Sequence, residues 1–190
     1  MKKSLLLIGL LLFASTTFAQ NKEYKDNNIT LSANYSFSDP SLYGISAEFG
    51  KNDLSFFNKY TSTILNISVS QMDYDNNLVN VKGNGCTVEI GNRIYKKRGY
   101  KSGIYLQWLW AYSSTSFKEN TALGNFNGTY SYWSLINHDI GYKIKIGKNL
   151  CIDPSIGFNW KWEVKGKGDI DNIYVDNFVF RCGAKLGYCF

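Results

Sequence analysis

The sequence is poor in the residues that bind metals or carry out acid-base chemistry. It has 190 residues, among them 1 histidine and 4 cysteines. No Cys-x-x-Cys spacing and no pair of histidines occurs, so the usual zinc ligand sets cannot be assembled. Asp169 and Asp171 are spaced like half of a calcium loop, but the remaining ligands are absent. We therefore expect no metal centre and no cofactor.

Long apolar runs and clustered positive charge are also missing. After the first 19 residues, the longest uncharged apolar run covers residues 104–112, about half of the ~18 residues that a membrane helix needs. A membrane location would therefore require a closed β-barrel, because only helices and barrels satisfy every backbone polar group in lipid. The formal net charge of +6 is scattered without a basic stripe, which argues against a nucleic-acid partner.

Residues 1–19 have the three regions of a secretory signal peptide. Lys2 and Lys3 form a basic head, residues 5–13 form an apolar core, and residues 17–19 form the ending that precedes cleavage before Gln20. No cysteine follows that point, which argues against a lipoprotein anchor. We expect a polar leader over residues 20–28 and a single domain over residues 29–190.

The rest of the chain alternates between apolar and polar residues, most clearly over residues 177–190. One face of this stretch consists of Phe178, Phe180, Cys182, Ala184, Leu186, Tyr188 and Phe190. A period of two residues is typical of a β-strand with one apolar face, and the stretch is more than twice the ~5–6 residues of a typical strand. By the same pattern we predict strands at residues 29–37, 42–50, 56–71, 81–95, 104–112, 129–146, 150–164 and 177–190.

This pattern predicts an all-β fold, an eight-stranded antiparallel up-and-down transmembrane β-barrel. All connections are predicted hairpins, with the long loops at residues 72–80, 113–128 and 166–173. Three features favour lipid as the environment of the apolar face: charges of both signs on the polar face, Tyr and Trp on the apolar face, and strands longer than the ~9–11 residues that cross a bilayer. A soluble lipocalin-like barrel has the same period and is the alternative.

The end of the last predicted strand resembles the insertion signal of bacterial outer-membrane β-barrels. That signal has a polar residue, a glycine two positions later, two alternating hydrophobic residues and a final aromatic, here Arg181, Gly183, Leu186, Tyr188 and Phe190. The resemblance to small OmpA-, OmpX- and OmpW-like barrels implies a monomer in the outer membrane of a Gram-negative cell. It also implies contact with lipopolysaccharide and the insertion machinery, a periplasmic leader, and long loops outside the cell.

The polar face is predicted to line a narrow interior. Side chains fill a barrel of this size, so a general porin is not expected. We predict a buried ionic network of Glu89, Arg93, Asp139, Lys143, Asp153, Lys161, Glu163, Arg181 and Lys185, because buried charges require partners. The turn at residues 147–149 sets Lys143 opposite Asp153. A structural role for these charges is favoured over an ion path.

The last hairpin allows its register to be predicted. A centre near Ile170 pairs Trp162 with Phe178 and Trp160 with Phe180. The same register sets Cys151 opposite Cys189, from which we hypothesise a disulfide bond. The alternative is that all four cysteines remain reduced, because opposed strand positions do not always have bridging geometry.

Three functional hypotheses remain. The first is a non-enzymatic structural, adhesive or surface-binding barrel. Phe117, Phe126 and Tyr130 near the longest loop are its contact candidates, and anchoring at the membrane interface is the alternative role for these three residues. The second is a lipid A or lipopolysaccharide-modifying enzyme centred on His138, with Ser134 predicted on the same face. His138 is predicted to neighbour Ile104 and Phe158, and no acid shares its face, which makes a poor triad. The third is a narrow pore for small apolar solutes.

Overall fold

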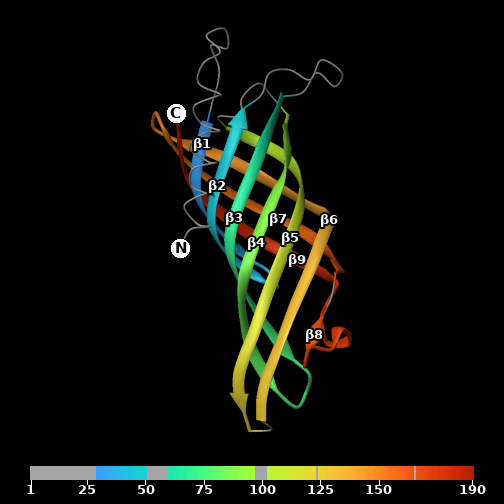
Figure 1. Cartoon of the computed structure of the whole chain (residues 1–190). Helices are drawn as coiled ribbons and strands as arrows, with labels where there is room; N and C mark the ends of the chain where they lie inside the picture. Colours follow the sequence, from blue (N-terminus) through green and yellow to red (C-terminus); the bar gives the residue numbers. More distant parts are fainter. Residues whose placement is uncertain (1–28, 51–59, 97–101, 123, 165) are drawn as a thin grey trace, which may run out of the picture.

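The computed structural model describes residues 29–50, 60–96, 102–122, 124–164 and 166–190 (Figure 1). The predicted signal peptide, residues 1–19, and the predicted leader, residues 20–28, lie outside the described residues. The main strands are β1 (Ile29–Phe37), β2 (Ser41–Gly50), β3 (Tyr60–Asp75), β4 (Asn80–Tyr95), β5 (Gly103–Thr121), β6 (Gly124–Ile146), β7 (Leu150–Glu163) and β9 (Phe178–Cys189). A two-residue strand, β8 (Lys167–Gly168), and a short 3-10 helix, η1 (Asn172–Tyr174), lie between β7 and β9.

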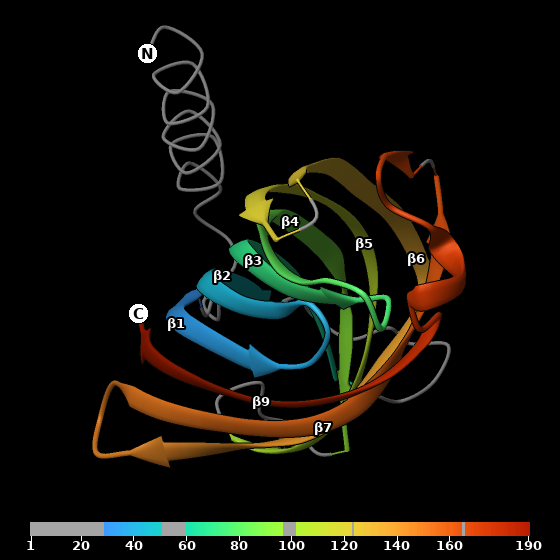
Figure 2. The ribbon, with the colours of Figure 1, turned by 90° about the horizontal axis from the view of Figure 1, so that it is seen from below.

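Eight of the described strands close into a ring. Each pairs antiparallel with its neighbour in the order β5-β4-β3-β2-β1-β9-β7-β6, and β5 also pairs with β6. The last strand closes on the first, with Thr30 opposite Cys189 and the amide of Phe190 donating to the carbonyl of Ile29 at 2.9 Å. Figure 2 shows these strands around a common interior. The predicted eight-stranded antiparallel fold is confirmed.

No helix among the described residues is long and apolar enough to cross a membrane.

Two predicted long loops are mostly strand. Residues 113–128 were expected to form a loop, but β5 and β6 pair without a break from Ser113 opposite Tyr132 to Thr121 opposite Gly124. Likewise β3 continues to Asp75 and β4 begins at Asn80. The polar composition of these stretches suggested loops, whereas alternate burial within a paired hairpin determined their conformation.

A β-bulge changes which residues of β6 face the interior. The pairing of β6 with β7 shifts between Trp133 and Ile136. Tyr132 and Ser134 before the shift are buried, and so is Asn137 after it. Tyr132 and Ile136 therefore lie on opposite faces although they are four residues apart, because an extra residue in one strand reverses the alternation.

Candidate functional site

The outward face of the ring is apolar over most of its height. Its large hydrophobic side chains are exposed, as at Val69 (60%), Trp110 (58%), Ile156 (65%) and Leu186 (60%). The residues between them point inward and include many buried charges. This arrangement is the reverse of a soluble domain, in which charged side chains are almost never fully buried unless paired.

Arg93 is the centre of a polar layer at the end of the interior that lies near Ile29. Its Nη1 lies 3.0 Å from Glu48 Oε2 and 2.6 Å from Asp153 Oδ2, and its Nε donates to Gln107 Oε1 at 2.7 Å. These partners come from β2, β7 and β5, whereas Arg93 belongs to β4. One guanidinium therefore connects opposite walls of the barrel.

Two tyrosines complete the same cluster. Tyr95 Oη donates to Glu48 Oε1 at 2.6 Å, and Tyr105 donates to Asp153. The guanidinium carbon of Arg93 lies 4.0 Å from the centroid of the Tyr105 ring. Tyr105 lies opposite Gly141, where a Cβ would clash with the phenol oxygen. The glycine therefore makes room for the ring.

A second polar layer surrounds Arg181 of β9. Its Nη1 lies 2.7 Å from Glu89 Oε1 and donates to Asn137 Oδ1 at 2.7 Å, and its Nε lies 3.6 Å from Asp139 Oδ1. Lys185 donates to Asn66 Oδ1 at 3.2 Å. This layer connects β9 to β3, β4 and β6 across the interior.

The predicted ionic network is present in most of its members, with changes in pairing. Lys143 donates to Glu48 Oε2 at 3.0 Å, and Asp153 binds Arg93. Lys161 lies 3.5 Å from Asp39 Oδ2 in the β1–β2 turn. Glu163 has no ion pair among the described residues, and its buried Oε1 has no hydrogen-bond partner among them.

Sequence reasoning missed Glu48, the acid that binds both Arg93 and Lys143. A signal was present, because Glu48 has the polar parity of a strand whose other parity holds Tyr43 and Ile45. The sequence alone does not show which side chains of non-neighbouring strands come within bonding distance inside the barrel. Glu48 meets Arg93 although β2 and β4 are not neighbours in the ring.

The two cysteines of the hypothesised disulfide are buried free thiols in the structure. The prediction that Cys151 lies directly opposite Cys189 is wrong, because Cys151 lies opposite Gly187. The aromatic pairs shift in the same direction, so that Trp160 lies opposite Phe178. β8 and η1 make the connection asymmetric, which moves the register by two residues. The thiols are diagonal neighbours on the inner face, and their disulfide stays a prediction that mass spectrometry of the unreduced protein can test.

Ser134 and His138 do not form a catalytic pair. Ser134 is fully buried and donates to Asn159 Oδ1 on the interior side. His138 lies beyond the bulge, where its ring stacks on Phe158 at a centroid distance of 5.7 Å and its other cross-strand neighbour is Trp108. The predicted shared face is wrong, for the reason already given for β6. The predicted contact with Phe158 is confirmed, but the one with Ile104 is not.

Four strands extend beyond the others at the end of the barrel that is far from Ile29. They are β3 and β5 at their C-terminal ends and β4 and β6 at their N-terminal ends. β2 begins at Ser41, which pairs with Gln71, so residues 72–75 of β3 have no partner on β2. We call residues 71–75, 80–85, 114–121 and 124–131 the projecting half, and the remainder of the ring the closed barrel. Figure 1 shows these strand ends, in green to yellow, reaching past β1 and β2.

Polarity is inverted in the projecting half. Its inner face and the residues packed against it form a buried cluster of Met72, Tyr74, Val81, Phe117, Phe126, Tyr130, Tyr132, Ile170 and Val175. Phe117 lies opposite Gly83, where a Cβ would approach the ring to 2.6 Å. The proposed role of Phe117, Phe126 and Tyr130 as exposed contacts is therefore wrong, because all three are core residues.

The outward face of the projecting half is polar. The residues between the core positions are exposed or half-buried and include Gln71, Asp73, Asp75, Asn80, Lys82, Asn84, Ser114, Ser116, Lys118, Asn120, Asn125, Asn127, Thr129 and Ser131. Ser114 and Ser131 hydrogen-bond across the strands at 2.9 Å. The neighbouring pair toward the closed barrel is Tyr112 with Trp133, whose ring centroids are 4.7 Å apart. The outward face thus changes from aromatic to polar within two residues.

The segment between β7 and β9 covers the apolar cluster. Ile170 and Val175 contribute to it, and the amide of Asp171 donates to Tyr74 Oη at 3.1 Å. The Asp171 carboxylate caps η1 by accepting from the amide of Ile173 at 3.1 Å. We call residues 166–177 the cap segment.

Comparisons with known proteins show the fold alone. No family model and no curated protein sequence matches. A major outer membrane protein from Thermus thermophilus has a similar structure, with a TM-score of 0.56, 11% identity, and coverage of 87% of this chain and 100% of that chain. This chain has the fold of a small outer-membrane β-barrel. Weaker similarities are to Ail, the attachment invasion locus protein of Yersinia pestis (TM-score 0.48, 13% identity, coverage 87% and 99%), and to the N-terminal β-barrel domain of Pseudomonas aeruginosa OprF (0.47, 12%, 87% and 98%).

Proposed function

We propose that this chain is a non-enzymatic outer-membrane protein that holds a surface-binding module outside the cell. The closed barrel spans the membrane, and the projecting half with its cap segment is the module. The signal peptide at residues 1–19 directs export, and Arg181, Gly183, Leu186, Tyr188 and Phe190 are read by the insertion machinery. The protein acts as a monomer and contacts lipopolysaccharide around its outer rim.

The inversion of both faces at one level is the observation that supports this proposal. An apolar outward face with a polar interior suits lipid, whereas a polar outward face with an apolar core suits water. The aromatic residues at the boundary, including Tyr112 and Trp133, are the side chains that favour a membrane-water interface. Ile29 and Phe190 lie together at the opposite end of the barrel, so the projecting half faces the outside and this end faces the periplasm.

The enzyme and the pore have less support. Among the described residues His138 Nδ1 is buried without a hydrogen-bond partner, and His138 does not share a face with Ser134. The interior is crossed by contacts such as those from Arg93 to Glu48 and Asp153, which join non-neighbouring strands. Side chains that bond from wall to wall take up space that a solute path would need at that level.

Labelling of single cysteines on intact cells tests the topology. The background replaces all four cysteines, Cys86, Cys151, Cys182 and Cys189, with serine, and a membrane-impermeant maleimide is the reagent. Ser116→Cys in the projecting half should be labelled on intact cells, Lys148→Cys in the β6–β7 turn only after lysis, and Ile90→Cys in neither case. Labelling of Lys148→Cys but not Ser116→Cys on intact cells would overturn the orientation.

A further inference from the structure

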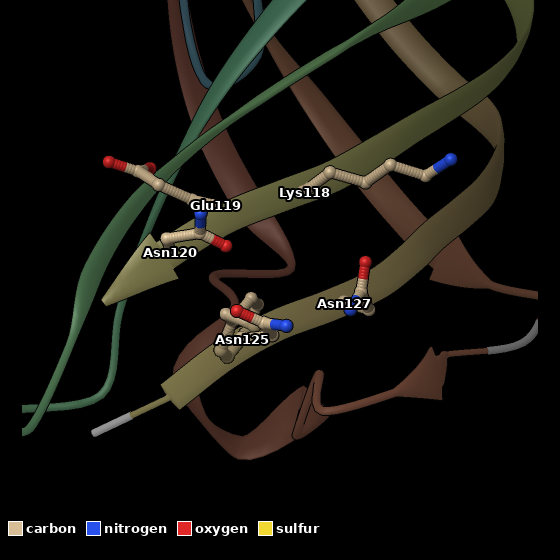
Figure 3. Close-up of a pocket in the computed structure, with 6 residues that line it drawn as sticks. Lys118, Glu119, Asn120, Asn125 and Asn127 are labelled. Atoms are coloured by element: carbon tan, nitrogen blue, oxygen red, sulfur yellow. The ribbon is translucent and has the colours of Figure 1, made fainter. Parts of the chain in front are cut away.

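A hollow of about 250 Å³ lies near the tip of the β5–β6 hairpin, in the projecting half (Figure 3). It is lined by Lys118, Glu119, Asn120, Asn125, Phe126 and Asn127. In the strand register Lys118 lies opposite Asn127, and Asn120 lies opposite Asn125. Alternation places these four side chains together on the outward polar face. We call them the tip array.

The tip array is not used to stabilise the fold. Lys118, Asn120, Asn125 and Asn127 are exposed, and their side chains make no hydrogen bond or ion pair with another described residue. The two acids beside them are already engaged. Glu119 Oε2 accepts from the amide of Lys82 at 3.2 Å, and Asp169 Oδ2 accepts from the amide of Asn127 at 2.8 Å.

These contacts hold the backbone beneath the array in place. Thr121 Oγ1 donates to the carbonyl of Gly124 at 2.8 Å, which closes the hairpin at its end. Phe126 is buried below, with its ring centroid 5.5 Å from that of Tyr74. The array therefore stands on a paired and anchored hairpin, and a fixed backbone reduces the entropy lost when a ligand binds.

The chemistry of the array fits a hydroxyl-rich ligand with negative charge. Each asparagine amide can both donate and accept, as a sugar hydroxyl does. Lys118 carries the only charge among the four side chains, and an ammonium group binds carboxylate or phosphate as a point charge. We propose that the tip array binds an acidic oligosaccharide, with Asn120, Asn125 and Asn127 bonding its hydroxyls and Lys118 its acidic group. This proposal gives the ligand class of the surface-binding module and rests on that proposed function.

Binding by the purified full chain in detergent tests the site. The probes are oligoalginate, which carries carboxylates, the phosphorylated core oligosaccharide released from the host's lipopolysaccharide, and neutral maltoheptaose. We expect at least one acidic probe to bind more tightly than maltoheptaose. The double variant N120A/N125A should weaken that binding about tenfold, because two sets of hydrogen bonds are lost, and Lys118→Ala should reduce its salt dependence.

Asn84→Ala is the matched control, since it removes an exposed amide from the same polar face outside the hollow. Its affinity should equal that of the unaltered protein. The proposal is overturned if no probe binds, if maltoheptaose binds as tightly as the acidic probes, or if Asn84→Ala weakens binding as much as the double variant. A preference for oligoalginate would indicate a glycan from elsewhere, and a preference for the core oligosaccharide one from the same membrane. Because binding is measured in detergent, its failure is separate from a failure of the cell-surface labelling.

Discussion

The closed barrel and the projecting half share four strands but bury opposite kinds of residue. In β5 the inward residue Gln107 bonds to Arg93, whereas ten residues later the inward Phe117 belongs to an apolar cluster. The outward residues change in the opposite sense, from Trp110, which is 58% exposed, to the exposed Lys118. A continuous strand can therefore present opposite polarity at its two ends, because alternation fixes only that its two faces differ.

The two regions also differ in what closes them. In the closed barrel eight strands satisfy one another's backbone groups, and charged side chains fill the interior. In the projecting half β3 has no partner on β2 beyond Gln71, and the cap segment covers the apolar face instead. The closed barrel should therefore depend on buried ion pairs, and the projecting half on ordinary hydrophobic packing.

The largest expected effect is in the closed barrel. Arg93→Met leaves Glu48 and Asp153 buried without their shared cation, which should lower the free energy of unfolding by ~3–5 kcal/mol. Urea unfolding in detergent, followed by heat-modifiable migration on a gel, measures this change. Lys82→Met is the control, since its pair with Asp73 is 65% and 63% exposed and should contribute little. Equal stability of the two variants would contradict a structural role for the interior charges.

Loss of the Phe117 side chain from the apolar cluster should destabilise the projecting half alone. Phe117→Ala removes a fully buried side chain, a change that typically costs ~3–5 kcal/mol. We expect rapid proteolysis within residues 113–131, while the closed barrel keeps its heat-modifiable migration because its own pairing is untouched. Ser116→Ala, the adjacent outward residue, should leave proteolysis unchanged. If Phe117→Ala abolished migration as a folded barrel, the two regions would not be separable.

A charge on the outward face should distinguish the two environments. Ile90→Arg places a cation on the apolar face of the closed barrel, where Ile90 is 49% exposed, and should cost ~2–4 kcal/mol in a bilayer. Asn84→Arg, on the same face of the same strand but in the projecting half, should have almost no effect. Unfolding from lipid vesicles measures both variants. Similar costs at the two positions would place the membrane boundary elsewhere.

The smallest expected effect concerns the cap segment. Tyr74→Phe removes the hydroxyl that accepts the amide of Asp171 but keeps the ring in the cluster, so stability should fall by ~1 kcal/mol. Hydrogen exchange should become faster in residues 166–177 and remain unchanged in β9. Unchanged exchange in the cap segment would show that this hydrogen bond does not hold it.

The change of polarity in the projecting half explains why the sequence predicted a loop at residues 113–128 where the structure has strands. Residues 113–117 read Ser-Ser-Thr-Ser-Phe, with too few apolar residues to indicate a strand. Ser113 and Thr115 face the interior at the level where it is still polar, and Phe117 begins the apolar cluster. A strand that crosses a change of polarity loses its simple alternation at the crossing, and there a pattern of apolar residues predicts a loop.

The sequence by itself determined the β class, the strand number and the inward parity of Glu89, Arg93, Asp139 and Lys185, because a two-residue period follows from backbone geometry alone. Only the tertiary structure decided which charges meet, since Glu48 of β2 reaches Arg93 of β4 past the intervening β3, and Arg93 reaches Asp153 of β7 across the interior. It also decided that Ser134 and His138 lie on opposite faces, because one bulge residue reverses the parity. Local periodicity thus fixes the face of a side chain, whereas closure of the ring and its bulges fix the partners.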